Sequence, residues 1–335
     1  MYTLLGISLL LGSLLTLNAL ASLVAGAVWR LAQPALRGVS ARLRAEILFT
    51  LRISAPAIAI IAVALLFIPS FLRHEPHGTA EVVSLKMATL AVLSAAGVAL
   101  AISRALRSWF ATTKLLRDWL ARATRIDLEH VSTPAFSIPH QFPIIAVVGT
   151  MRPRLFIAER VLQSLSKEEL RASIAHEAGH LNARDNLKRS LLRACRDLLM
   201  LIPSGRSLDR AWAEAAECAA DDYAANEGTK IALDLASALV KIARMIPARR
   251  QAAMPLAVFL VGVEESRGVK ARIRRLLDLA SKGENHSRPV VSPIVRILPA
   301  IAVVSLLAIG LTVAANPQTL VSVHLLIERV VHVLS

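Results

Sequence analysis

The chain has 335 residues, of which 55% are hydrophobic and only 4% aromatic, and its mean hydropathy is +0.55. This composition is not that of a water-soluble enzyme and favours insertion into a membrane. The net charge of +15 would also suit nucleic acid. Anionic lipid is the simpler partner for a basic protein at a membrane, so we expect no nucleic-acid function.

Four apolar segments are predicted to cross the bilayer. The first, residues 3–29, carries no charge and exceeds the roughly 20 residues that are needed. A signal peptide would have cations in front of its apolar region, whereas the first cation here is Arg30, so we expect no cleavage. Further spans are predicted at residues 53–72, 87–103 and 297–315.

Cations between the spans predict the orientation. Five arginines between residues 30 and 52 place that loop in the cytoplasm, whereas the short loop of residues 73–81 is balanced in charge and external. Six cations between residues 104 and 125 return the chain to the cytoplasm. The N-terminus is therefore expected outside, and residues 320–334 are predicted to form an external interfacial helix.

Three short strands are predicted after the third span, at residues 135–139, 143–149 and 154–158. They would form a small sheet. An edge strand of that sheet could pair with an extended peptide, or the sheet could serve as a scaffold only.

A capping-box pattern, Ser166 followed by Glu169, predicts the start of a helix. That helix contains His176-Glu177-Ala178-Gly179-His180, which places two imidazoles one turn apart with a carboxylate beside them. This is the zinc-peptidase arrangement. Because zinc acidifies its bound water, Glu177 is the expected general base for peptide hydrolysis.

Catalytic zinc takes three protein ligands, so a third must come from elsewhere in the chain. A second helix, with Ser207 near its start and Gly228 past its end, carries Glu217 and Asp221 one turn apart. Glu217 is the expected third ligand, and Asp221 is expected to hold the other ring nitrogen of a ligand histidine. Asp185 is a second candidate for the latter role.

Alternatives exist for the third ligand and for the group that stabilises the oxyanion. Glu214 faces nearly the same way as Glu217 and is the reserve ligand. The thiolate of Cys218 could also bind zinc, although adjacent helical residues point about 100° apart. Tyr223 and His140 are the candidates for the oxyanion.

Residues 267–275 carry five cations. We expect this run to lie against anionic lipid, where each nearby cation contributes on the order of 1 kcal/mol.

The motifs resemble those of the BlaR/MecR-type integral-membrane zinc metallopeptidases. The resemblance rests on GTMRPRLFI (149–157), LSKEELR (165–171), HEAGH (176–180) with Asp185, and ECAAD (217–221). It implies that one zinc ion per chain is bound by His176, His180 and Glu217. Glu177 would be the catalytic carboxylate.

By this resemblance the protein would carry out regulated proteolysis at the cytoplasmic membrane, cleaving itself or a cytosolic repressor. The sequence after the fourth predicted span is short, so we expect no C-terminal penicillin-binding sensor domain and no β-lactam sensing. Prenyl-protease and heat-shock membrane peptidases share the His-Glu-x-x-His and Glu-x-x-x-Asp elements and would imply quality control of membrane proteins. A catalytically idle scaffold or signalling subunit is a third interpretation, against which the intact Glu177 argues.

The sequence therefore predicts a mostly α integral membrane protein with about four transmembrane helices. A cytoplasmic α+β zincin-like metallopeptidase domain would lie between the third and fourth helices. The expected parts are a membrane domain (1–107), a peptidase domain (108–292), and the fourth span with a short external tail (293–335). The expected substrate is a protein or peptide, and the two cysteines indicate no disulfide framework.

Overall fold

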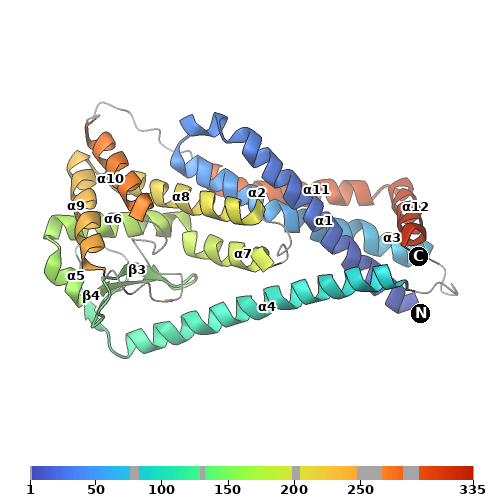
Figure 1. Cartoon of the computed structure of the whole chain (residues 1–335), viewed down its shortest axis with the longest axis horizontal. Coiled ribbons are helices and arrows are strands. Elements are labelled where there is room, and N and C mark those ends of the chain that lie inside the picture. Colours follow the sequence, from blue (N-terminus) through green and yellow to red (C-terminus); the bar gives the residue numbers. More distant parts are fainter. Residues whose placement is uncertain are drawn as a thin grey trace.

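The computed structural model describes residues 2–75, 83–128, 133–197, 204–246, 266–281 and 294–334. The fold is mostly helical with one small sheet, as predicted. Long helices gather at one end of an elongated molecule, and the sheet lies at the other end (Figure 1).

Four helical segments are long and apolar enough to cross a membrane, which agrees with the predicted number. They are α1 (Tyr2–Ala32), the continuous segment Ala41–His74, α4 (Leu85–Leu120) and α11 (Ile294–Ala314). The second consists of α2 (Ala41–Ala62), the π-helical turn η2 (Val63–Phe67) and α3 (Ile68–His74). Large apolar side chains of α11 remain exposed, among them Ile297, Val304 and Ile309, as expected for a surface that faces lipid.

Helix α4 connects the membrane helices to the sheet. Its 36 residues correspond to about 54 Å, well beyond the roughly 30 Å thickness of bilayer hydrocarbon. Near its C-terminal end Trp119 is buried against Phe156, with ring centroids 5.2 Å apart. The far end of this apolar helix is therefore fixed in the core beneath the sheet (Figure 1).

The sheet has four strands in the order β1-β2-β4-β3. These are β1 (Thr124–Ile126), β2 (Ala135–Ile138), β3 (Ile145–Val148) and β4 (Arg154–Ala158). β2 and β4 are parallel, whereas β1 with β2 and β3 with β4 are antiparallel, so β3 is an edge strand. The three predicted strands are confirmed, and β1 was missed because its Thr-Arg-Ile sequence is short and largely exposed.

The turn between β3 and β4 depends on a glycine. Gly149 has φ of 107°, and a Cβ atom there would lie 2.8 Å from the carbonyl oxygen of Arg152. Only glycine fits this position without strain.

Helices cover the sheet and continue the chain. They are α5 (Glu159–Ser164), α6 (Lys167–Ala183), α7 (Asp185–Asp197), α8 (Ser204–Ala225), α9 (Thr229–Met245) and α10 (Ser266–Ser281). The last described helix is α12 (Pro317–Leu334), where the sequence predicted one. The strands share one hydrophobic core with residues of α6, α9 and α10, so the sheet and α6 form a rigid unit.

The predicted capping box at the start of α6 is present. Ser166 Oγ accepts from the backbone N–H of Glu169, and Glu169 Oε2 accepts from the backbone N–H of Ser166 at 2.8 Å. The same carboxylate accepts from Ser237 Oγ and Lys241 Nζ, each at 2.7 Å. These bonds connect the start of α6 to α9.

This carboxylate makes stability depend on pH. Burial opposes its ionisation, but Lys241, the Ser166 backbone and Ser237 outweigh burial and lower the pKa of Glu169 below 4.5. A carboxylate whose pKa is lower in the folded state stabilises the fold above the unfolded pKa, and this contribution is lost as the pH falls through the folded value. The melting temperature of Glu169→Gln should therefore fall less on acidification from pH 6 to pH 3 than that of the unaltered protein. Parallel acid shifts in the two proteins would contradict this assignment.

Two ion pairs, one buried and one partly buried, connect α2 to α7 and α8. Arg52 Nε donates to Asp209 Oδ1 at 2.9 Å, and Lys188 Nζ donates to Glu46 Oε1 at 2.5 Å. Trp212 of α8 lies in a hydrophobic core that also contains residues of α1 and α2. The first half of α8 therefore packs against the candidate membrane helices.

Candidate metal centre

Helices α6 and α8 approach each other closely at a glycine. A Cβ atom at Gly179 would lie 3.0 Å from the Cα of Ala220 and 3.1 Å from the Cβ of Tyr223. Because the nearest obstacle is backbone, α8 could not remain in place next to a larger residue. The glycine of the His-Glu-Ala-Gly-His motif thus sets the distance between the two helices that carry the candidate ligands.

Gly179→Val should push α8 away and carry Glu217 out of reach of the histidines. We expect zinc affinity to fall by about tenfold or more, the size typical of changes just outside the ligands. Gly97→Val in α4 is the matched control, since a Cβ there meets nothing within 4 Å. Competition with a fluorescent zinc chelator measures both variants, and equal affinities would show that this contact does not position Glu217.

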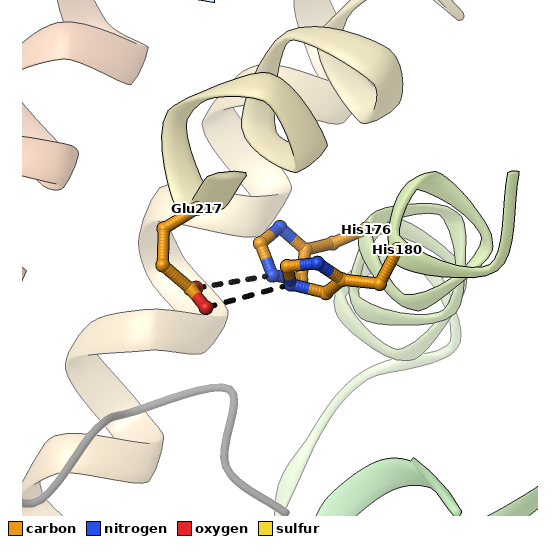
Figure 2. Close-up of side chains that lie close together, drawn as sticks. All are labelled: His176, His180 and Glu217. Carbon is orange, nitrogen blue, oxygen red and sulfur yellow. Dashed lines mark ion pairs between the residues drawn. The ribbon is translucent and has the colours of Figure 1, made fainter. Parts of the chain in front are cut away.

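Three candidate ligands converge from these two helices (Figure 2). His176 Nε2 lies 3.6 Å from Glu217 Oε2, and His180 Nε2 lies 3.5 Å from Glu217 Oε1. One ligand atom from each residue lies within 4.8 Å of the others. Zinc bonds of about 2.0–2.2 Å place tetrahedral ligands roughly 3.3–3.6 Å apart, so this donor set fits a zinc ion.

An aspartate contacts the outer ring nitrogen of each histidine. His176 Nδ1 lies 2.9 Å from Asp221 Oδ1, and His180 Nδ1 lies 2.7 Å from Asp185 Oδ2. The Nε2 atoms of both rings therefore face Glu217. Such carboxylates fix the ring orientation and tautomer of a metal-binding histidine. The structure brings both aspartates of the sequence prediction to this position, one behind each ring.

Glu177 lies beside the histidines and contacts the sheet. Its side chain is buried, and Oε2 accepts from the backbone N–H of Val147 in β3 at 3.0 Å. A cavity of about 20 Å³ is lined by residues that include Glu177, His180 and Val147. This volume holds about one water molecule, so the carboxylate is placed to contact a single water next to a candidate ligand.

Helix α7 covers the outer edge of β3. Asn186 Nδ2 donates to the carbonyl oxygens of Val147 at 2.9 Å and Gly149 at 3.2 Å. Arg189, on the same helix, lies 3.4 Å from Glu217 Oε1. A peptide that paired with this edge would have to displace Asn186 from the two carbonyls.

Arg272 of α10 is the main residue that the sequence did not reveal. Its guanidinium donates to both oxygens of Asp221, from Nε at 2.8 Å and from Nη2 at 2.6 Å, while Nη1 donates to Glu217 Oε2 at 3.0 Å. A helical signal was present in the sequence, because Arg272 precedes the apolar Leu276 by one turn and both are buried on the same face.

The predicted lipid contact of residues 267–275 is therefore wrong for two of its five cations. Arg272 is buried among carboxylates, and Arg275 pairs with Asp222 at 2.6 Å and donates to the Cys218 carbonyl at 3.2 Å. A buried face of α10 packs against α8, and the carboxylates of α8 attract these guanidinium groups more strongly than a lipid surface would.

The charges of this cluster are mutually dependent. Burial alone would raise the pKa of Glu217, but His180 and Arg272 hold it well below its usual range. Burial likewise opposes ionisation of Asp221, yet Arg272 and His176 lower the pKa of that carboxyl. For His180, burial disfavours the imidazolium, but Glu217 and Asp185 outweigh it and raise the pKa to about 10. The carboxylates are thus ionised and ready to bind a cation, which must displace a proton from His180.

The other sequence candidates lie outside this arrangement. Glu214 is exposed on α8 and is not a member of the ligand group. Burial raises the pKa of the Cys218 thiol, which disfavours a thiolate ligand. Tyr223 is 39% exposed, and His140 Nδ1 accepts from the backbone N–H of Phe142 at 3.1 Å. Neither Tyr223 nor His140 lines the cavity beside Glu177.

Comparison with known families agrees with the chemistry of this cluster. Residues 146–257 match the model of Peptidase family M48, a region that begins in β3 and contains the helices of all three candidate ligands. No curated protein matches the chain. Together, the match and the His/Glu group support a metallopeptidase, and the apolar helices indicate a membrane protein. The chain thus contains a region similar to Peptidase family M48.

Proposed function

We propose that the protein is a membrane-embedded, zinc-dependent endopeptidase that acts at the cytoplasmic face. His176, His180 and Glu217 would bind the zinc ion, and Glu177 would be the general base. The observation that carries the proposal is the convergence of the three ligand atoms within 4.8 Å, next to a cavity that Glu177 lines.

The residues present suit peptide hydrolysis. Bound zinc would polarise the scissile carbonyl and acidify a water molecule. Glu177 would take a proton from that water and deliver it to the leaving amine. Val147 would hold the Glu177 carboxylate in place during both transfers, while Asp221 and Asp185 would keep the two ligand rings oriented.

The substrate would bind as an extended strand along β3, which is an edge strand. The carbonyls of Val147 and Gly149 face away from β4 and accept from Asn186 in this structure. Displacement of Asn186 would free them for a peptide backbone. Movement of α7 is therefore part of the proposed binding step.

The proposed topology follows from the cations of the sequence. Residues 108–292 would form the cytoplasmic peptidase domain, between a membrane domain at 1–107 and a fourth span with an external tail at 293–335. The basic segments that flank the spans support this orientation, with the N-terminus outside. Anionic lipid would contact the cytoplasmic loops.

Regulated or signalling proteolysis, by cleavage of a cytosolic repressor or of the protein itself, is the role that the BlaR/MecR-type motifs favour. The match to Peptidase family M48 supports a peptidase. The regulatory role is supported only by the BlaR/MecR-type motifs. The second candidate is a quality-control peptidase, which the shared His-Glu-x-x-His and Glu-x-x-x-Asp elements favour. Cleavage of misfolded membrane proteins without an external signal would distinguish it.

The proposal is tested by zinc content in detergent. Glu217→Ala should lose one zinc equivalent relative to the unaltered protein, because two histidines alone bind catalytic zinc weakly. Glu214→Ala, which removes an exposed carboxylate from the same helix, should keep it. Equal zinc in all three proteins would rule out Glu217 as a ligand, and a lack of zinc in the unaltered protein after loading would favour the idle scaffold.

A further inference from the structure

A second group of potential metal ligands lies far from the candidate metal centre. Glu75 follows α3, and His324 and Glu328 lie one turn apart on α12. One ligand atom from each residue lies within 4.8 Å of the others. Figure 1 shows α3 and α12 beside each other at the end of the molecule opposite the sheet.

Packing holds this group together. Ser70 Oγ of α3 donates to the carbonyl oxygen of Leu320 in α12 at 2.8 Å, and both residues are buried. Phe71, which follows Ser70, and Ile327, two turns after Leu320, lie in a core that also includes residues of α1 and α4. The two elements that supply the ligands are therefore already fixed relative to each other, so little ordering would accompany binding.

The two carboxylates lie near different ring nitrogens of His324, and neither is close enough for a direct hydrogen bond. His324 Nδ1 lies 3.9 Å from Glu75 Oε2, and His324 Nε2 lies 3.6 Å from Glu328 Oε1. Both exceed the range of a hydrogen bond. An imidazole binds a metal ion through a single nitrogen, and one ligand atom from each of the three residues lies within 4.8 Å of the others. Ligands of one zinc ion are about 3.3–3.6 Å apart, so side-chain movements of about 1 Å would complete a site.

A further observation concerns the imidazole itself. His324 Nδ1 is buried and makes no hydrogen bond within the described part of the chain, which is costly unless some other group satisfies the atom. A second histidine is close, since the rings of His74 and His324 have centroids 5.6 Å apart. Mixed imidazole and carboxylate ligands suit zinc and similar divalent ions rather than calcium or magnesium.

We propose that Glu75, His324 and Glu328 bind a second divalent transition-metal ion, with zinc the best fit. The ion connects α12 to the end of the membrane segment Ala41–His74. With the orientation proposed above, the site faces the exterior. It is independent of the candidate peptidase centre, with which it shares no residue.

Zinc titration of the purified full-length protein in detergent tests the proposal, with bound zinc counted after removal of the excess. The unaltered protein should bind two equivalents, whereas Glu217→Ala and His324→Ala should each bind one and the double variant none. His332→Ala removes a histidine two turns further along α12, outside the ligand group, and should still bind two. If His324→Ala still binds one zinc equivalent, the variant is folded, because zinc binding at the candidate peptidase centre requires the folded chain.

The outcomes separate the two sites. Two zinc equivalents in His324→Ala would overturn the second site and leave the proposed peptidase centre standing. Two zinc equivalents in Glu217→Ala would overturn the peptidase centre and leave the second site standing. If His324→Ala failed to fold, Glu328→Gln would decide, since this carboxylate is nearly half exposed and its replacement leaves the packing intact. A zinc dissociation constant at least tenfold weaker than that of the unaltered protein supports the site, and an unchanged constant overturns it.

Discussion

Replacing Glu177 by Gln is expected to lower the rate of peptide hydrolysis by about 10²–10⁴-fold, with zinc content unchanged. The amide has nearly the shape of the carboxylate, and its oxygen can still accept from the Val147 N–H. It cannot take a proton from water. The loss should therefore appear in the catalytic rate and leave the metal centre assembled.

The measurement uses purified protein in liposomes with a fluorogenic peptide library or its own self-cleavage as readout, and zinc is counted in the same samples. Glu168→Gln is the matched control, because Glu168 is an exposed glutamate of the same helix. It should retain full activity. Full activity in Glu177→Gln would remove Glu177 from the mechanism, and loss of zinc would assign it a structural role instead.

Arg272→Gln is expected to have the largest effect on stability. Arg272 is buried and contacts both Asp221 and Glu217, so its removal leaves Asp221 with only His176 to compensate its charge among the contacts described above, and Glu217 with the histidines and Arg189. Removing one partner of a buried ion pair costs about 3–5 kcal/mol. The metal-free protein should lose free energy of unfolding of that order.

Thermal unfolding in detergent with a chelator present measures this effect. Arg274→Gln is the control, since Arg274 is exposed on the same helix and should change the melting temperature little. Added zinc should restore Arg272→Gln in part, because the ion supplies positive charge next to Glu217. Identical melting temperatures for the two variants would mean that Arg272 does not neutralise the carboxylates.

Local patterns in the sequence were enough to predict several elements. The uncharged stretches predict the spans, the Ser166–Glu169 capping box predicts the start of α6, and the spacing of His176 and His180 predicts their shared face. Each of these depends on residues close together in the chain. Helical periodicity also placed Glu217 and Asp221 on one side of α8.

The remaining features depend on contacts between distant segments. Arg272 lies 51 residues from Asp221. Its spacing from Leu276 indicates which face of α10 is buried, but nothing in the sequence indicates which carboxylates that face meets. The two glutamates of α8 differ by one turn, and only the packing of α8 against α6 decides that Glu217 faces the histidines while Glu214 is exposed. The Val147 contact of Glu177 likewise depends on how the sheet lies against α6.

The ion pairs from α2 to α7 and α8 connect a candidate membrane span to the helices around the candidate metal centre. Lys188 pairs with Glu46, and Asp209 pairs with Arg52. Glu46 and Arg52 both lie outside residues 108–292. Asp185, one turn before Lys188, orients His180, and α8 carries both Asp209 and Glu217. A membrane helix tilts when the thickness of the surrounding hydrocarbon changes. If α2 spans a bilayer as proposed, a change in lipid chain length would alter the geometry around the candidate zinc ligands through these ion pairs.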